Sequence, residues 1–448
     1  MCYDPSAMNL ELASPDELRA IIAQQQATIA RLEARIRELE GQGDGTTPTG
    51  MPGHRSSSRA RPPRKAKEDY TKRERAFTRP RSAPMHRVVH AAERCPDCGT
   101  HLLGGWVKRT REVIELPVAP VAITEHVLIE RECPLCRVRV VPTDALRGVV
   151  DGKQRLGVRL VSLIATLREA MRLPVRMIQR YLRAIHGLAL SVGAIVAAGQ
   201  RVAARGTAEV AAIRAAIRAS PVAQADETGW RQDGENGYVW IFRTPTACLF
   251  RYGTRGGTMV DTVLGEAFAG VLVSDFYAAY DHLPGWHQRC WPHLLRAIHD
   301  LRVRHPDDAR LQGWARRVRR VYDWAVAYRG ATVAERHTTA LRCMRVLARV
   351  CRPYLEDASA AQRTLCRRIS KYLAQLFVFV ARPEVPSHNN DTERDLRHLV
   401  ISRKISGGTR SAEGTTTKMT LSTLYGTWRL QERNPFDESL RLLSSPQA

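Results

Sequence analysis

The first periodic stretch of apolar residues lies within residues 12–41. These positions follow the alternating four- and three-residue steps of a heptad repeat, and Gln25 is the one polar position in the seam. Ser14 is placed to cap the helix, Pro15 suits its first turn and Glu17 completes a capping box. The pattern predicts a short coiled coil through which the chain forms a homo-oligomer; an amphipathic helix packed on its own chain is the alternative. The apolar positions are Leu18, Ile22, Ile29, Leu32, Ile36 and Leu39.

Residues 42–90 show no apolar period and are rich in Gly, Pro, Ser and Arg. Such a composition predicts an extended or disordered linker. It would leave the preceding helix nothing nearby to pack on, which favours self-association of residues 12–41. The excess of Lys and Arg would let the linker lie along phosphates without reading base sequence, although a merely solvated linker can have the same composition.

Two Cys-x-x-Cys pairs, Cys95 with Cys98 and Cys133 with Cys136, mark residues 91–145. Four thiolates suit a tetrahedral zinc ion, and each pair can turn both sulfurs toward one ion. The segment between the pairs alternates in a strand-like way, so we expect a zinc ribbon whose structural Zn²⁺ supplies much of the folding free energy. A redox Cys-x-x-Cys site is the alternative, but it requires only one pair. The alternating apolar positions are Val113, Ile114, Leu116, Ile123, Val127 and Ile129.

Residues 150–218 change to a helical period of apolar residues. Gly187 can end one helix, and Ser191 can cap the next. The arrangement resembles a helix-turn-helix DNA-binding unit, although any two helices joined at a glycine give a similar pattern. The helical positions upstream of the turn are Leu160, Leu163, Ile164 and Leu167.

After Pro221 the period changes from helix to strand. Three short strands, a helix and a fully apolar strand follow, as at the start of the ribonuclease-H-like fold, in which the first and fourth strands are neighbours. We therefore expect a multidomain α+β protein with a ribonuclease-H-like α/β catalytic domain at residues 220–440, interrupted by a basic helical insertion at about 297–385. The expected elements are strands at 222–230, 238–243, 247–252 and 271–273 and a helix at 256–268.

Asp226 and Asp275 stand near the ends of the first and fourth expected strands, and Glu393 stands at the start of a later helix. Phosphodiester transfer needs an activated nucleophile and a stabilised leaving oxygen, and two divalent ions perform both tasks. Such ions prefer carboxylate oxygens. We therefore expect Asp226, Asp275 and Glu393 to form a catalytic site that binds two Mg²⁺ or Mn²⁺ ions. Alternation turns Glu227 to the opposite sheet face, so it is expected to be non-catalytic.

The charge balance points to the partner. The chain has 69 Lys and Arg residues against 45 Asp and Glu residues, a formal net charge of +24. Such an excess repels itself unless a polyanion neutralises it, and nucleic acid is the leading candidate; a basic protein without a nucleic-acid role is the alternative. The sequence has no long apolar run and no signal-peptide pattern. We therefore expect no membrane association, a cytoplasmic, nucleoid-associated location, and cysteines that are thiols or metal ligands.

Several short motifs stand in order along the chain: Asp226–Trp230, Ser274–Tyr280, Cys290–Arg296, Asn389–Arg394, Arg403–Gly408 and Asn434–Phe436. Together they resemble the bacterial transposases named after insertion sequence 66, over roughly residues 10–440. The resemblance implies DNA transposition by an Asp-Asp-Glu triad at Asp226, Asp275 and Glu393. It also implies that the chain recognises the terminal inverted repeats of its element and a target DNA, and it suggests accessory proteins of the element as partners.

The basic residues Arg394, Arg403 and Lys404 follow the glutamate and are expected to bind DNA, because guanidinium groups match phosphate geometry. A solvated helix face is the alternative for all three. His293 lies in a segment similar to the family's Trp-x-His-Leu-x-Arg motif, from which Pro292 and Leu295 depart. Its role stays open between a substrate contact and a packed helix residue, so His293 is left out of the catalytic set.

Three functions fit these patterns. An active transposase is favoured because all three acids are intact. A DNA-binding regulator derived from a transposase would look the same outside the triad. A nuclease of the same fold would cut DNA without joining it, but the N-terminal helix and the paired cysteines favour an assembly that holds two DNA ends.

Overall fold

The computed structural model describes residues 83–114, 116, 121–142, 144–328, 330 and 332–445, together with Ala27 and Ala30. The chain divides into two compact units, Met1–Met85 and His86–Ala448, and all helices and strands named below belong to the second unit. The coiled coil expected at residues 12–41 and most of the linker expected at 42–90 lie outside the described residues.

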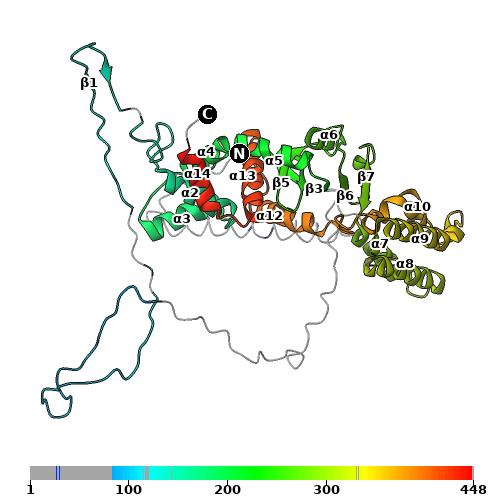
Figure 1. The fold of residues 1–448 in the computed structure, drawn as a ribbon, viewed down its shortest axis with the longest axis horizontal. Coiled ribbons are helices and arrows are strands. Elements are labelled where there is room, and N and C mark those ends of the chain that lie inside the picture. Colours follow the sequence, from blue (N-terminus) through cyan, green and yellow to red (C-terminus); the bar gives the residue numbers. More distant parts are fainter. Residues whose placement is uncertain are drawn as a thin grey trace. The chain divides into compact units, whose positions relative to one another are not determined.

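A five-stranded mixed sheet carries two of the candidate acids (Figure 1). Its strands are β3 (Val222–Gln232), β4 (Glu235–Arg243), β5 (Cys248–Gly253), β6 (Val271–Ser274) and β7 (Trp286–Arg289). They lie in the order β5-β4-β3-β6-β7. The first three strands in sequence pair antiparallel, whereas β6 pairs parallel with both β3 and β7. The first and fourth strands, β3 and β6, are therefore neighbours, as expected.

Local sequence explains how these strands form. Asp233 and Gly234 connect β3 to β4 with φ of 52° and 84°, which is the two-residue turn that matches the twist of a hairpin. β6 is buried along its whole length, because a parallel strand inside a sheet is covered on both faces. Helix α6 (Thr258–Leu264) makes the crossover between β5 and β6. The expected order of three strands, a helix and a buried strand is thus what the structure contains.

Four helices precede the sheet in the sequence, and two more lie at the C-terminal end of the described chain. Helix α3 ends at Gly187, which adopts the left-handed conformation with φ of 65°. The Ser191 side chain then caps α4 by accepting a hydrogen bond from Ala194 N at 3.1 Å, as predicted. No helix of the described residues is long and apolar enough to cross a membrane. The helices are α2 (Val158–Glu169), α3 (Val175–His186), α4 (Val192–Arg205), α5 (Thr207–Arg218), α13 (Ala412–Leu430) and α14 (Pro435–Ser444).

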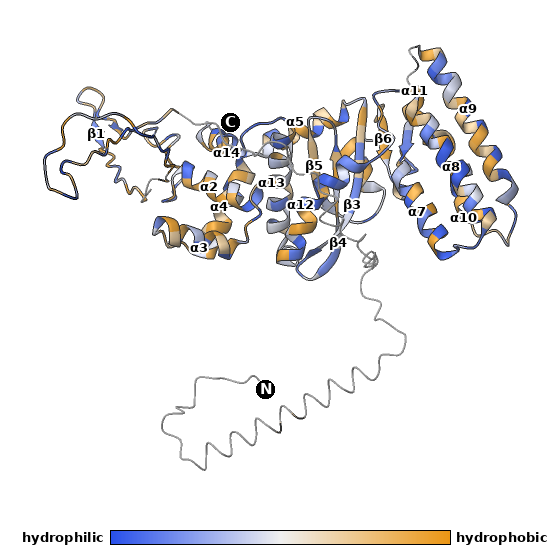
Figure 2. Ribbon diagram, turned by 90° about the horizontal axis from the view of Figure 1, so that it is seen from below, coloured by the Kyte–Doolittle hydropathy of each residue, from blue (hydrophilic) through white to orange (hydrophobic). Residues whose placement is uncertain are grey.

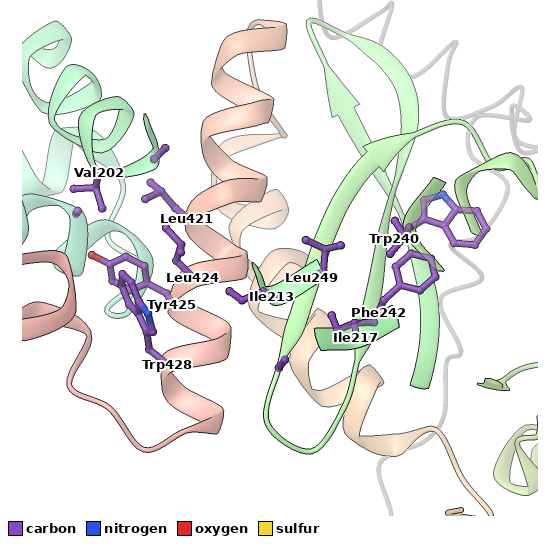
Figure 3. Close-up of a cluster of buried hydrophobic side chains, with 14 of the residues drawn as sticks. Val202, Ile213, Ile217, Trp240, Phe242, Leu249, Leu421, Leu424, Tyr425 and Trp428 are labelled. Atoms are coloured by element: carbon purple, nitrogen blue, oxygen red, sulfur yellow. The ribbon is translucent and has the colours of Figure 1, made fainter. Parts of the chain in front are cut away.

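Helix α13 joins the helical region to the sheet in one hydrophobic core. It packs against β5 and also against α2, α4 and α5. Figure 3 shows Leu421 and Leu424 of α13 between Val202 of α4 on one side and Ile213 and Leu249 on the other. We expected the helical region at residues 150–218 and the domain that contains the sheet to follow one another as separate domains. In the structure the helical region and the five-stranded sheet share one hydrophobic core.

A second group of helices lies between β7 and α12 and has a core of its own. These helices are amphipathic, with hydrophobic and hydrophilic residues gathered on different faces (Figure 2). They correspond to the expected insertion, and they begin at Trp291, somewhat before the expected boundary. Helix α12 (Asn390–Ser406) then returns to the sheet and packs on β3 and β4. The insertion contains α7 (Trp291–Arg304), α8 (Ala309–Ala327), α9 (Val333–Cys351), α10 (Arg363–Lys371) and α11 (Val378–Ala381).

The segment between the two cysteine pairs does not form the strands that its alternation predicts. The described part of residues 91–145 contains β1 (Arg131–Glu132) and β2 (Arg139–Val140), which pair with each other. Leu116 and Ile123 lie on the expected strands but are 86% and 94% exposed. A strand needs a hydrogen-bonded partner and a surface on which to bury its apolar face, and alternation alone supplies neither. The expectation of strands at these positions is therefore corrected.

A buried ion pair connects three of the helices. Glu169 of α2 is fully buried, 2.7 Å from Lys418 Nζ of α13 and 3.6 Å from His398 Nε2 of α12. Burial by itself raises the pKa of Glu169, but Lys418 and His398 outweigh it and bring the pKa down to about 2. The carboxylate is thus charged in the folded protein and ties α2 to the two helices that flank the sheet.

We predict that Glu169→Gln lowers the free energy of unfolding by about 3–5 kcal/mol, because it leaves the Lys418 ammonium buried without its partner. The double variant E169Q/K418M should recover much of this loss. The depressed pKa means that Glu169 stabilises the fold fully above pH 4.5, and that this stability is lost as pH falls toward 2. Denaturant unfolding between pH 3 and 7, with the exposed Glu266→Gln as control, measures both effects. Equal losses in the single and double variants would contradict the pairing.

Candidate functional site

The register of β3 and β6 places Asp226 and Asp275 at equivalent positions. Gln224 of β3 is opposite Val273 of β6, and the two strands run parallel. Asp226 follows Gln224 by two residues within β3, and Asp275 follows Val273 by two residues, directly after the end of β6. The charge of Asp275 raises the pKa of Asp226, so the two carboxylates act on each other. The structure therefore brings the two expected acids together, although they are far apart in the sequence.

The loop that carries Asp275 is held by a buried arginine. Arg289 at the end of β7 is fully buried, and its guanidinium donates to the Asp275 carbonyl oxygen at 2.7 Å. The same guanidinium pairs with Asp281 at 2.5 Å, and Asp281 also accepts hydrogen bonds from Lys371 and Tyr372, each at 2.8 Å. The role of Arg289 could not be predicted from the sequence, because a single arginine in a strand gives no pattern that indicates its partners.

Helix α12 is fixed to β3 beside Asp226. The buried Asn389 donates through its side-chain amide to the Ala225 carbonyl oxygen at 2.7 Å. Its side-chain oxygen accepts a hydrogen bond from Thr392 Oγ1 at 2.8 Å, which holds the first turn of the helix. Glu393 lies in that turn, and its backbone N–H donates to the Asn389 carbonyl oxygen at 3.2 Å. Asn389, which precedes the glutamate in the sequence motif, thus sets where Glu393 stands relative to Asp226.

Glu393 faces the first turn of α7. Its Oε1 atom lies 3.5 Å from His293 Nε2 and 3.9 Å from the Arg296 guanidinium. This oxygen is buried and accepts no hydrogen bond from any described residue, and His293 Nδ1 is likewise buried without a partner. Burial lowers the pKa of His293, while the charges of Asp275 and Glu393 act to raise it. His293 therefore lies beside Glu393, in the first turn of α7.

The acids repel one another. Burial raises the pKa of Asp226 well above its ordinary value, and the charges of Glu227, Asp275 and Glu393 raise it further. The hydrogen bond that Asp226 Oδ1 accepts from the Glu227 backbone N–H, at 2.9 Å, opposes this effect. A partly buried group of carboxylates with an unbonded oxygen suits a divalent cation. In this geometry, however, no three His, Cys, Asp or Glu side chains of the described residues stand close enough to hold a metal ion.

Glu227 lies on the opposite face of β3 from Asp226, as alternation predicts. It pairs across the strands with the buried Trp240. Its carboxylate accepts a hydrogen bond from Tyr280 Oη at 2.8 Å and pairs with Arg255 at 3.1 Å. These partners hold Glu227 within the core side of the sheet, away from α12.

The three basic residues that we expect to bind DNA, Arg394, Arg403 and Lys404, differ in how exposed they are. Arg403 is half-buried, and its guanidinium donates to the Gly229 carbonyl oxygen and to Thr228 Oγ1 of β3. Burial lowers the pKa of Arg403. Arg394 and Lys404 are exposed, and Arg394 pairs with Asp391 at 3.3 Å. Arg403 therefore connects α12 to β3, whereas Arg394 and Lys404 keep the exposure that phosphate binding needs.

Both cysteine pairs form the same tight turn. In the first, Cys95 N–H donates to the Thr100 carbonyl oxygen and Gly99 N–H donates to that of Cys95. Residues Gly99 and Arg137 occupy equivalent positions and have φ of 74° and 61°. The two turns therefore have the same backbone form, which two knuckles of one metal site require. The second turn repeats the pattern at Cys133, Val138 and Arg137.

One thiol in each turn has a lowered pKa. Hydrogen bonding to Thr100 lowers the pKa of Cys98 to about 7. The backbone N–H groups of Cys136 and Leu135 lower the pKa of Cys133. Thiolates are the form that binds zinc. The described residues do not bring the sulfurs of the two turns into one cluster, so the structure contains the two turns and leaves the joint site a prediction.

The helix pair expected to contact DNA exposes its first helix. Helix α4 packs against α2, α3, α13 and α14, and its middle is buried. Helix α3 buries only Ile178 and Leu182 and contains no acidic residue. Its exposed face carries Arg176, Arg180 and Arg183. In a helix-turn-helix the second helix contacts the bases, but here the second helix, α4, is packed in the core. If this unit contacts DNA, the exposed helix α3 has the surface to do so.

Comparison with known proteins connects these residues to a family. The sequence model of the Transposase IS66 family matches residues 153–417, which is more than half of the chain and includes all three candidate acids. A relative from Sinorhizobium fredii (strain NBRC 101917 / NGR234), named Uncharacterized protein y4jO, is 41% identical over 63 residues. This match covers 14% of the chain and only 20% of the relative, whose name states no activity.

We predict that Asp226→Asn raises the free energy of unfolding in the absence of divalent ions, by roughly 1–3 kcal/mol, because it removes a buried charge repelled by Glu227, Asp275 and Glu393. Mg²⁺ or Mn²⁺ should stabilise the wild type and have little effect on the variant. Thermal unfolding with EDTA and with each ion measures this, and the exposed Asp307→Asn is the control. A variant less stable than the wild type in EDTA would contradict the repulsion.

Proposed function

The chain belongs to the IS66 family of transposases, and we propose that it catalyses metal-dependent cleavage and strand transfer at the DNA ends of an insertion sequence. The observation that carries the proposal is the parallel register of β3 and β6, which sets Asp226 and Asp275 side by side. Glu393 approaches the same sheet face from the first turn of α12. Three carboxylates are the donor set that two-metal phosphodiester chemistry needs.

The order of the strands supports a ribonuclease-H-like catalytic domain. Three antiparallel strands are followed by a helix and two parallel strands, and the fourth strand lies beside the first. Asp226 within the first strand, Asp275 directly after the fourth strand and Glu393 on a later helix suit that fold. The bounds of this domain, residues 220–440, stay a prediction.

The chain's own residues would place the acids for the reaction. Asp226, Asp275 and Glu393 would hold two divalent ions, which activate the attacking oxygen and stabilise the leaving oxygen in line. Arg289 holds the backbone of Asp275, and Asn389 holds the turn that carries Glu393. His293 stands against Glu393 and would restrict the orientation of its carboxylate. No covalent bond between protein and DNA is needed in this scheme.

DNA contact is supported by charge. The net charge of +24 favours binding to a polyanion, since neutralised phosphates release their counterions. The exposed arginines of α3 and the exposed Arg394 and Lys404 provide phosphate contacts on the described surface. Recognition of terminal inverted repeats, self-association through residues 12–41 and a need for accessory proteins stay predictions.

The test is a cleavage and joining assay with Mg²⁺ or Mn²⁺ on labelled DNA that carries the ends of the element. We predict that Asp226→Asn, Asp275→Asn and Glu393→Gln each bind DNA like the wild type and lose cleavage and joining by a factor of 100 or more, roughly the effect of removing a major transition-state contact. The triple variant R176Q/R180Q/R183Q is the opposite control and should lose DNA binding first.

Each other outcome selects a different function. Wild-type binding without cleavage, even with accessory proteins added, would favour the DNA-binding regulator. Cleavage without joining would favour the nuclease. Activity that persists in the Glu393 variant would place the third carboxylate elsewhere, and unchanged binding by the α3 variant would remove that helix from the DNA interface.

We also propose that Cys95, Cys98, Cys133 and Cys136 bind one structural Zn²⁺. The equivalent backbone turns and the lowered pKa of Cys98 and Cys133 support this. Cys133→Ser should abolish binding of about one zinc ion per chain and remove the metal-dependent hydrogen-exchange protection of residues 91–145. The control is Leu135→Ser, which changes an exposed residue of the same turn. Full zinc content in the Cys133 variant would contradict the site.

A further inference from the structure

The helical insertion contains a pocket that the candidate acids do not use. It has a volume of about 510 Å³ and is lined by Arg345 and Arg349 of α9 and by Arg352 of the short helix η4 (Arg352–Tyr354) that follows it. The half-buried Leu355 contributes apolar surface to the same pocket, and the fully buried Ile369 lies behind it. We call the surface formed by Arg345, Arg349 and Arg352 the arginine groove.

The spacing of these arginines makes them one cationic surface. Positions 345, 349 and 352 are four and three residues apart, so their side chains lie on one face of the helix. All three are exposed. Like charges at this spacing destabilise a helix, so their presence on one face calls for an anionic partner.

The chain does not supply that partner within the described residues, where none of the three arginines forms an ion pair with an acid. Three other arginines of the insertion are paired with acids, as the following distances show. Arg310 lies 3.3 Å from Asp357, and Arg319 lies 2.7 Å from Asp323. Arg367 lies 2.8 Å from Glu356. The groove therefore differs from these three positions in keeping its charges available, and it differs from other unpaired arginines of the insertion in lining a pocket.

We propose that the arginine groove binds the phosphodiester backbone of DNA. Guanidinium groups match phosphate oxygens in a forked geometry, and three of them along one helix face suit successive phosphates of a strand. The exposed apolar part of Leu355 can contact a sugar of the same strand, which a free phosphate ion would not need. The inference rests on the proposed function, since it takes DNA as the chain's partner.

The groove also adjoins the network that holds a candidate acid. Ser370 lines the pocket, and the next residue of α10, Lys371, pairs with Asp281 at 2.8 Å. Asp281 in turn binds Arg289, which holds the Asp275 carbonyl oxygen. A DNA strand in the groove would therefore lie against the helix that supports the Asp275 loop, and the insertion would serve as a second DNA contact of the catalytic domain.

The experiment compares two triple variants of the full chain with equal loss of charge. R345Q/R349Q/R352Q removes the groove, and R310Q/R319Q/R367Q removes three paired arginines of the same insertion. Binding to a labelled DNA duplex is measured from 50 to 300 mM salt. We expect the groove variant to bind at least about tenfold more weakly and to lose about 0.9 from the logarithmic salt slope for each phosphate contact removed. The matched control should stay within about twofold of the wild type.

The outcomes separate the groove from the proposed function. Equal weakening of both variants would mean that net charge alone acts, and it would overturn the groove. Wild-type affinity in the groove variant would overturn it too, while leaving the transposase proposal intact. Absence of DNA binding by the wild type would defeat both. Unchanged circular dichroism and melting temperature of each variant exclude unfolding as the cause, because all six arginines lie on the surface of the insertion.

Discussion

The parallel pairing of β3 with β6 is the constraint on which the candidate site depends. It sets Asp226 beside Asp275 and gives α12 the strand on which Asn389 docks. Without that pairing the two acids would belong to separate segments, and Glu393 would have no fixed place opposite them. The same pairing concentrates negative charge, because burial and neighbouring carboxylates raise the pKa of Asp226.

Buried ion pairs and hydrogen bonds around the site hold the acids in place against their mutual repulsion. Arg289 binds the Asp275 loop from β7, and Arg243 of β4 binds Asp395 of α12 at 2.8 Å. Removing one partner of such a pair leaves an uncompensated charge, so these contacts hold the loop and the helix in single positions. The clustered buried carboxylates lower the stability of the folded protein. The hydrophobic core that α13 shares with the sheet and the other helices compensates for this loss.

Local patterns predicted much of the framework correctly. The left-handed Gly187, the Ser191 cap and the succession of strands around α6 follow from short-range rules that hold in any fold. The same rules failed between the cysteine pairs, where alternation predicted strands at positions that the described structure does not assign to any strand. They also could not tell that α4 is a core helix, since its small residues suit either a buried or an exposed position.

The sequence by itself determined the types of most elements, the segments in which the three acids lie, and the basic character that points to DNA. These depend on side-chain chemistry and on the period of a few neighbouring residues. The tertiary structure alone decided that Arg289 holds Asp275, that Arg403 binds β3 rather than standing free, and that Arg345, Arg349 and Arg352 line one pocket. These outcomes depend on contacts between residues distant in sequence, and such contacts leave no local period to read.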